Sequence, residues 1–405
     1  MIDLSEFFSI QENLIRFVPK ETSRFLGKKI NWENRLLGIT GGRGTGKTTL
    51  LLQHLSEKAR SELSKCLYLS ADSVRVEAMG LYEIVSGFFR LGGDEVIIDE
   101  IHKHANWPQI IKNLYDSFPG GKIRFSGSST LGIQLSKADL SRRVVFYELP
   151  GLSFREFLAF IGYGNFAPIA LEELLKNHTE YASMVLKNGP ILGHFHEYLR
   201  YGVYPFFLEG RDEYYEKLKN IIEKVLFEDI LVTSGVKPSS IPIFKRILWL
   251  VATSQPFEPN MERISRSLGI SRPALYGYME YLERSCLLAN IMPCAKGHRL
   301  VRKPAKVYID NTNLLKAIGR EISPEDPVGT VRETFFQNQI RSAGYRLCVP
   351  SKGDFVVEER YVFEIGGKSK GKHQVAGITD AYIIRDDIEV GFSNVIPLWL
   401  FGFLY

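Results

Sequence analysis

Residues 38–49 read GITGGRGTGKTT, and this stretch decides the fold of the first part of the chain. Gly41, Gly46, Lys47 and Thr48 match the spacing G-x-x-x-x-G-K-[ST] at every defined position. An apolar β-like run at 35–40 precedes the loop, and a helix-like run, TTLLLQHLSEKAR, follows it. A glycine-rich loop between a strand and a helix is typical of a phosphate-binding loop.

The residue types in this loop suit a nucleotide phosphate. Glycines let backbone N–H groups turn toward a bound phosphate, and the following helix adds the positive end of its dipole. We expect Lys47 to reach the β- and γ-phosphates of ATP and Thr48 to ligate Mg²⁺. The predicted ATP-binding residues are Gly41, Gly42, Gly44, Thr45, Gly46, Lys47, Thr48 and Thr49.

A second motif, DEVIIDEIHK at residues 94–103, contains a short apolar run followed by two acids. The run predicts a buried strand that ends at Asp99, whose carboxylate can hold Mg²⁺ together with Thr48. Glu100 comes next and is predicted to polarise the attacking water as a catalytic base. The alternative interpretation of Glu100 is a surface acid at the start of a helix.

Strands and helices alternate around these motifs. Strand-like runs lie at 66–72, 122–126 and 144–149, with helix-like stretches between them. This alternation predicts an α/β fold with a doubly wound parallel sheet of the P-loop NTPase type. Ligands bind at the carboxyl ends of strands in such sheets, so Ser128 or the neighbouring Ser129 is placed to contact the γ-phosphate or the attacking water. A simple turn is the alternative for either serine.

Four blocks resemble the prokaryotic ATPases of the AAA superfamily that carry a C-terminal domain of unknown function. They are GGRGTGKTTLL (41–51), DEVIIDEIHK (94–103), IRFSGSST (123–130) and SRRVVFYELPGLSFREFLAF (141–160), in the family's order. The resemblance implies a catalytic arginine that senses the γ-phosphate, and Arg143 matches its position, acting on its own site or on a neighbour's. The alternative is a solvated charge pair with Arg142. The chain departs from the family pattern at Gly151, usually proline, and at Val203, usually the second glycine of a turn.

Composition restricts the class of protein. The chain has 405 residues, 45% hydrophobic and 24% charged, with a formal net charge of +5, which argues against a disordered or coiled-coil protein. The four cysteines form no C-x-x-C pair, so we expect reduced thiols without a disulfide framework. No apolar run approaches the ~20 residues that span a bilayer. The terminal run IPLWLFGFLY is expected to be a buried strand, and the protein to be cytoplasmic without membrane contact.

We divide the chain into four parts: an ATPase core at 1–160, a helical lid at 161–235, a winged-helix-like domain at 236–320 and a small α/β domain at 321–405. Residues 236–242 are expected to be a linker. Gly269 and the helix cap Ser271 predict a helix-turn-helix, and two short strands would form a basic wing. Its cationic residues are Lys296, His298, Arg299, Arg302, Lys303 and Lys306.

DNA contact through residues 261–306 is one interpretation of this region, and packing between domains is the other. The second predicted helix presents Ser271, Arg272, Tyr276 and Glu280 outward. Only one of these residues is cationic, and a glutamate repels phosphate. The outward residues therefore favour packing, whereas the basic wing favours DNA.

Three acids near the end of the chain form a further pattern. Glu333 on a helix and Asp354 and Glu364 on successive strands resemble the metal site of restriction-endonuclease-like folds. Such a site uses carboxylates to hold Mg²⁺ and a lysine, two residues after the second acid, to orient water. Gly366 stands at that position, and Lys368 follows two residues later. We therefore expect an endonuclease-like fold with little or no nuclease activity. The alternative is a working site in which a flexible loop brings the Lys368 ammonium back to the acids.

Together these patterns predict an enzyme that binds ATP and hydrolyses it to ADP and phosphate with Mg²⁺. Hydrolysis would drive a conformational change in a C-terminal half that contacts DNA or a protein partner. The alternative is a slow nucleotide-dependent switch or scaffold with no DNA role. A small-molecule kinase is disfavoured, since the sequence has no evident acceptor-pocket pattern.

Overall fold

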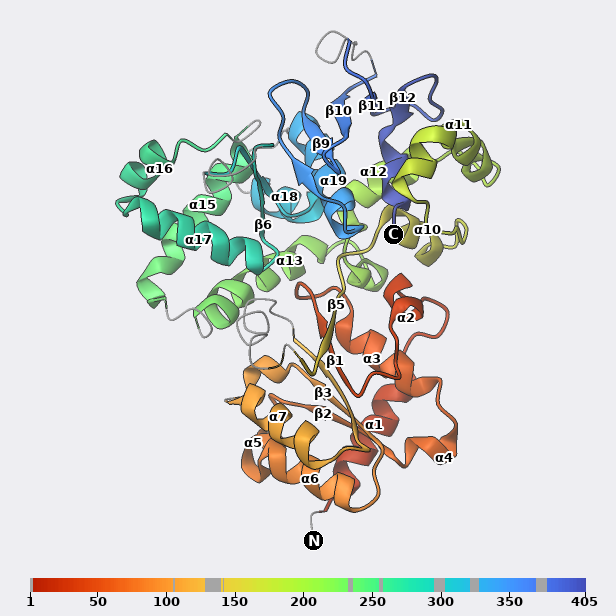
Figure 1. The fold of residues 1–405 in the computed structure, drawn as a ribbon, viewed down its shortest axis with the longest axis vertical. Coiled ribbons are helices and arrows are strands. Elements are labelled where there is room, and N and C mark those ends of the chain that lie inside the picture. Colours follow the sequence, from red (N-terminus) through yellow and green to blue (C-terminus); the bar gives the residue numbers. More distant parts are fainter. Residues whose placement is uncertain are drawn as a thin grey trace. The chain divides into compact units, whose positions relative to one another are not determined.

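A computed structural model describes residues 3–104, 106–127, 140, 142–231, 236–254, 258–294, 303–320, 328–368 and 377–405. The chain forms two compact units, Met1–Pro150 and Gly151–Tyr405, here called the first and second unit (Figure 1). Within the described ranges, no helix combines the length and apolar character that crossing a membrane requires.

The first unit is built on a five-stranded parallel sheet in the order β2-β3-β4-β1-β5. Its strands are β1 (Leu36–Thr40), β2 (Cys66–Ser70), β3 (Glu95–Asp99), β4 (Lys122–Ser126) and β5 (Val145–Glu148). Its helices are α1 (Ser5–Phe17), α2 (Phe25–Lys29), α3 (Lys47–Ser56), α4 (Arg60–Leu63), α5 (Val74–Met79), α6 (Leu81–Arg90), the 3-10 turn η1 (Ile101–Lys103) and α7 (Trp107–Ser117). The predicted α/β fold is confirmed.

Strand β1, which lies between β4 and β5, separates two hydrophobic cores. Its residues are all buried, and alternate side chains point to opposite faces of the sheet. Leu36 packs into the core that α5, α6 and α7 cover, whereas Leu37 and Ile39 pack into the core beneath α3. Burial on both faces holds β1 in place, and with it the loop that β1 leads into.

A buried carboxylate joins the sheet to α3 in the first unit. Glu95 is 2% exposed and lies 3.1 Å from His54 Nε2, 2.8 Å from Lys58 Nζ and 2.9 Å from Arg124 Nε. Burial alone raises the pKa of a carboxyl group, but His54, followed by Arg124 and Lys58, outweighs it. The pKa of Glu95 is therefore lowered to about 2.

We expect Glu95 to make the first unit sensitive to acid. Because its folded-state pKa lies below the ordinary value of 4.5, its stabilisation is present above that pH and is lost as the pH falls toward 2. One pKa unit corresponds to about 1.4 kcal/mol, so the free energy of unfolding should fall by roughly 3 kcal/mol across this range. Urea unfolding at a series of pH values measures this free energy. Glu95→Gln should remove most of the pH dependence of the free energy of unfolding. Asp94→Asn, which changes the exposed neighbouring acid, is the control and should keep that dependence. If Asp94→Asn removed the pH dependence and Glu95→Gln kept it, Glu95 would not be its source.

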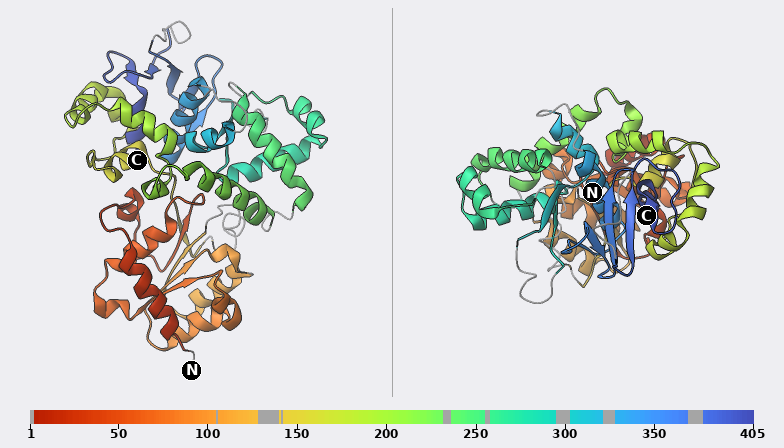
Figure 2. Two further views of the ribbon diagram at one scale, coloured as in Figure 1. Left: turned by 180° about the vertical axis from the view of Figure 1, so that it is seen from behind. Right: turned by 90° about the horizontal axis from the view of Figure 1, so that it is seen from above.

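The second unit combines a helical part with two sheets. Its helical elements before the first strand are α10 (Phe154–Phe160), α11 (Leu171–Leu186), α12 (Leu192–Tyr201), η2 (Pro205–Glu209), α13 (Tyr214–Lys224), the π-helical turn η3 (Val225–Ile230), η4 (Pro238–Ser240), α15 (Ile241–Thr253), α16 (Met261–Leu268) and α17 (Arg272–Arg284). Helices α15, α16 and α17 lie on one side of this unit, away from its larger sheet (Figure 2).

The two sheets follow in the last third of the chain. An antiparallel pair is formed by β6 (Leu288–Ile291) and β7 (Lys306–Ile309), and the helices α18 (Thr312–Gly319) and α19 (Val328–Ser342) come next. The larger sheet has the order β12-β11-β10-β9-β8. Its strands are β8 (Leu347–Cys348), β9 (Phe355–Val357), β10 (Tyr361–Gly366), β11 (Ala381–Arg385) and β12 (Val395–Pro397), and the 3-10 helix η6 (Leu398–Phe403) ends the fold.

Three local expectations were wrong. The run RVEAMGLYEIVSGFFR at 75–90 is predicted to be one helical stretch, but it lies in two helices, because Gly80 has a φ of +83° that separates α5 from α6. The segment expected as a linker begins α15 at Ile241, with Pro242 in its first turn, where a missing N–H costs nothing. The terminal apolar run is buried as expected but forms η6 after a three-residue strand.

The two departures from the family pattern occur at the same place in the fold. A Cβ atom on Gly151 would lie 2.4 Å from Val203 Cγ1, so only glycine leaves room for this valine. Val203 is buried, and its carbonyl oxygen accepts a hydrogen bond from Leu152 N at 2.7 Å. A larger residue at position 203 is therefore accommodated by a smaller one at position 151.

A disulfide contradicts the expected reduced thiols. Cys294 and Cys348 are bonded across 54 residues of sequence, with a Cα–Cα distance of 5.0 Å. The segment after β6 pairs with the segment after β8 through Pro293 and Val349, which brings the two cysteines together. The bond also lines a cavity of about 920 Å³ between β6, α19 and β8. Sequence spacing does not indicate such a pair, because it depends on the pairing of distant strands.

We expect two thiols in the denatured, unreduced chain, from Cys66 and Cys286, and four after reduction. A loop of 54 residues limits the entropy of the unfolded chain, so reduction should lower the free energy of unfolding by roughly 4 kcal/mol. Thiol titration in denaturant and urea unfolding with and without dithiothreitol measure both effects. Cys286→Ser is the matched control and should still respond to the reductant. Four thiols before reduction would contradict the pairing.

Candidate functional site: a phosphate loop beside an acidic strand end

The loop between β1 and α3 has the form that its sequence predicts. Gly46 caps α3 with a φ of +94°, which is costly for a residue that has a Cβ atom. Thr45 Oγ1 donates to Gly42 O at 3.0 Å and holds the loop in a compact turn. The backbone N–H groups at the start of α3, and the positive end of its dipole, therefore face the end of the loop.

Lys47 lies in the loop rather than pointing into solvent. It is 5% exposed, and its Nζ donates to Gly41 O at 3.0 Å and to Gly42 O at 2.7 Å. The ammonium group is thus held inside the turn formed by the glycines. A phosphate group in this turn would meet one positive charge surrounded by backbone donors.

The Asp99 carboxylate accepts hydrogen bonds from hydroxyl groups on three other elements. Its Oδ2 accepts hydrogen bonds from Thr48 Oγ1 at 2.6 Å and Tyr68 Oη at 3.0 Å. Its Oδ1 accepts from Ser126 Oγ and from Glu100 N, the latter at 3.1 Å. The parallel register explains this arrangement, because β2, β3 and β4 end at the same edge of the sheet.

Burial, followed by the Asp99 carboxylate, raises the pKa of Tyr68 well above its usual range. The hydroxyl therefore stays protonated and acts as a donor to Asp99. Tyr68 and Ser126 were not predicted from the sequence. Ser126 had a usable signal as the last, polar residue of an apolar strand, whereas Tyr68 lies inside a buried strand and has none.

Glu100 is placed beside Asp99 by an unusual backbone conformation. Its φ and ψ are +52° and +38°, and its N–H donates to Asp99 Oδ1 and, at 3.3 Å, to Ser126 Oγ. Its side chain is 21% exposed, and Oε2 lies 3.7 Å from His102 Nε2. A left-handed glutamate at the end of a buried strand is rare and is found where a side chain must be aimed.

A further residue missed by the sequence analysis supports the loop. Arg24 is 4% exposed, and its guanidinium donates to Thr45 O and, at 2.8 Å, to Pro150 O. It therefore ties the phosphate loop to the segment after β5. No motif surrounds Arg24, so the sequence offers no signal for this contact.

Arg143 does not join this group. Its guanidinium donates to both oxygens of the Asp116 carboxylate, at 3.1 and 3.2 Å. The register of β5 on β1 pairs Val145 with Leu37, so Arg143 lies level with the start of β1, while the loop follows its end. A strand rises by ~3.3 Å per residue, which separates Arg143 from Gly41 by roughly 15–20 Å. The structure therefore places Arg143 away from its own loop, and its role at its own site or at a neighbour's stays a prediction. Ser128 and Ser129 lie outside the described residues.

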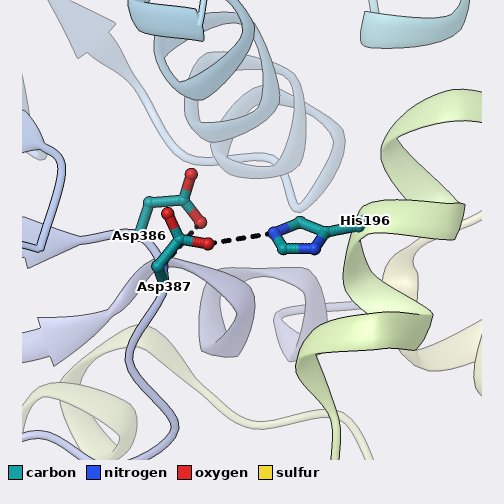
Figure 3. A group of neighbouring side chains, drawn as sticks. All are labelled: His196, Asp386 and Asp387. Atoms are coloured by element: carbon teal, nitrogen blue, oxygen red, sulfur yellow. Dashed lines mark hydrogen bonds and ion pairs between the residues drawn. The ribbon is translucent and has the colours of Figure 1, made fainter.

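A second group of ligating side chains lies in the second unit (Figure 3). His196 Nε2, on α12, is 3.0 Å from Asp387 Oδ1, and ligand atoms of these two residues and Asp386 all lie within 4.8 Å of one another. Arg332 Nε donates to Asp386 Oδ2 at 2.8 Å, and Asp386 is 6% exposed. The arginine supplies positive charge to these carboxylates, so the group is an ion-pair cluster.

Comparison with known proteins follows the division of the chain. Residues 33–158 match a family model described as an AAA domain, and residues 192–325 match one described as a domain of unknown function, DUF8612. The chain is similar to the uncharacterized protein MJ1637 of Methanocaldococcus jannaschii, with 26% identity over 92% of this chain and 85% of that protein.

Two solved structures show weaker likeness. The Walker-type ATPase PABY2304 of Pyrococcus abyssi is 12% identical with a TM-score of 0.40, covering 78% of this chain and 96% of its own. AMPPCP-bound DnaA from Aquifex aeolicus is 17% identical with a TM-score of 0.26, covering 68% and 86%. Residues 33–158 are therefore similar to an AAA domain, and they contain a parallel sheet and a loop at 41–48 with the spacing of a phosphate-binding loop.

Proposed function

We propose that the first unit binds ATP with Mg²⁺ and hydrolyses it to ADP and phosphate. The observation that carries this proposal is the 2.6 Å hydrogen bond between Thr48 Oγ1 and Asp99 Oδ2, which joins the phosphate loop to the end of β3. Both side chains offer oxygen ligands, which Mg²⁺ prefers, and would hold the ion. The ion would neutralise charge on the β- and γ-phosphates.

The neighbouring side chains suit the remaining steps. The phosphate oxygens would take over the Lys47 ammonium from its two carbonyl partners, Gly41 O and Gly42 O. Glu100 would accept a proton from water as the water oxygen bonds to the γ-phosphorus and the bond to ADP breaks. Arg143 remains a candidate for action on a neighbouring copy, where its distance from its own loop is no obstacle.

For the second unit we propose a protein-contacting output, with DNA contact as the alternative. The exposed residue Arg272 pairs with Glu262 at 2.8 Å, and Glu280 pairs with Arg284 at 2.5 Å. These charges are already balanced within α16 and α17, which weakens the case for phosphate contact. The lid, winged-helix-like and endonuclease-like divisions after residue 160 are part of this proposal. The alternative to hydrolysis that drives a conformational change is a slow nucleotide-dependent switch.

Phosphate release from ATP by the full chain, without any added acceptor, tests the proposal. We expect release that requires Mg²⁺ and stops on chelation. A folded protein that neither binds nucleotide nor releases phosphate would overturn the proposal. Repeating the assay with duplex DNA distinguishes DNA contact from protein contact. If DNA increases the rate of phosphate release and this increase becomes smaller at higher salt concentration, DNA contact is favoured. An unchanged rate favours the protein-contacting output or the switch.

A further inference from the structure

Lys306 connects the smaller sheet of the second unit to two acids outside it. It lies on β7 and is 7% exposed. Its Nζ is 3.0 Å from Glu333 Oε2, on α19, and 3.3 Å from Asp354 Oδ1, just before β9. From the sequence, Lys306 is predicted to lie in a basic wing for DNA, and the two acids are predicted to belong to a metal site. The contact with both acids removes Lys306 from any DNA-binding wing.

Each of the two carboxylates has a second donor besides the lysine. Tyr308 Oη, also from β7, donates to Glu333 Oε2. Burial, followed by the Glu333 carboxylate, raises the pKa of Tyr308 far above its usual range, so its hydroxyl stays a donor. Ile365 N donates to Asp354 Oδ2 at 2.8 Å. The two acids are therefore held by donors from β7 and β10.

The lysine provides the charge that these acids need. A carboxylate taken out of water is costly unless a cation or hydrogen bonds compensate it. Burial alone lowers the pKa of Lys306, but Glu333 and Asp354 outweigh burial and raise it, so the ammonium stays charged. The ring of Phe355, 5.3 Å from Nζ, adds a favourable contact for a cation.

The arrangement lacks the geometry of a preformed metal site. Glu333, on α19, and Asp354, just before β9, both contact the same ammonium, at 3.0 and 3.3 Å. Among the His, Cys, Asp and Glu side chains that the structure describes, the group of three that lie close enough to hold an ion is His196, Asp386 and Asp387, which contains neither Glu333 nor Asp354. The place between the two acids is filled by a cation that belongs to the chain.

We propose that the Lys306 ammonium is the resident cation of the Glu333–Asp354 pair and excludes divalent metal ions from it. The second unit is then no metal-dependent nuclease, for a reason different from the glycine at position 366. The lysine that would orient water is present, contributed by another strand, but it lies where the metal would bind. Removing its charge should create a divalent-cation site that the natural chain lacks.

Mn²⁺ binding to the nucleotide-free full chain tests this inference. We expect Lys306→Gln to bind one Mn²⁺ more than the wild type and to gain thermal stability on its addition, since a ligand that binds the folded state stabilises it. Glutamine keeps a donor of similar length toward the acids. Lys303→Gln is the matched control, because Lys303 is exposed and near the same strand, and it should behave as wild type. Any Mn²⁺ held by Thr48 and Asp99 is common to all variants.

Adding Asp354→Asn to Lys306→Gln should abolish the gain. A folded Lys306→Gln chain without extra Mn²⁺ would overturn the proposal. A second measurement does not depend on that variant folding. In the presence of Lys306, Asp354→Asn should leave Mn²⁺ binding unchanged, and the wild-type chain with Mn²⁺ should leave plasmid DNA intact. Mn²⁺ binding or DNA cleavage by the wild type that Asp354→Asn removes would also overturn it.

Discussion

Replacing Glu100 by glutamine should leave ATP bound but slow its hydrolysis by ~10²-fold or more. Glutamine keeps the shape of the side chain and its backbone bonds to Asp99 and Ser126. It cannot accept a proton from the attacking water, so only the chemical step should suffer. Equilibrium binding of ATP, measured beside phosphate release in single turnover, separates affinity from catalysis.

Glu57→Gln is the matched control for this variant, because Glu57 is an exposed acid at the end of α3. It should hydrolyse ATP like the wild type. A Glu100→Gln chain that hydrolyses ATP at the wild-type rate would show that another group activates the water. A joint loss of binding and hydrolysis would instead assign Glu100 to holding the loop and Asp99 in place.

The first unit could be predicted in detail because its signals are local. Strands β1 and β3 are short runs in which every residue is buried. The loop spacing then located Lys47 and Thr48, and the run before Asp99 located the acidic strand end. Parallel strands bring their carboxyl ends to one edge, so the meeting of Thr48 and Asp99 followed from the predicted sheet.

Contacts set by strand order could not be predicted in the same way. Strand β4 lies between β3 and β1, which brings Ser126 against Asp99, but a run of residues does not reveal its neighbours. The position of Arg143 in the sheet could not be predicted for the same reason. Its sequence position before β5 was clear, yet the register with β1 places it at the far end of the sheet, paired with Asp116.

The second unit was harder for a related reason. Its contacts join residues that are far apart in the sequence, such as Cys294 with Cys348 and Lys306 with Asp354. A cationic residue near a predicted wing looks like a DNA contact until its partner is known. Pattern and spacing identified the acids Glu333 and Asp354 as a group, but they did not reveal the lysine that comes from another strand.

Replacing Lys47 by methionine should lower the affinity for ATP by ~10²-fold, because a charge-assisted contact contributes about 1.5–3 kcal/mol. Turnover should be lost as well. Methionine has nearly the same length and fills the same space, so the change removes the charge while keeping the packing. Isothermal titration with ATP and Mg²⁺ gives the affinity, and phosphate release gives the turnover.

Lys28→Met is the control, since Lys28 is an exposed lysine on α2 of the same unit. It should bind ATP like the wild type. In Lys47→Met, Gly41 O and Gly42 O lose their donor, so thermal unfolding without nucleotide must be compared first. If the variant is folded and still binds ATP with near-normal affinity, the phosphates do not contact Lys47, because the substitution removes the ammonium that the loop holds at Gly41 O and Gly42 O.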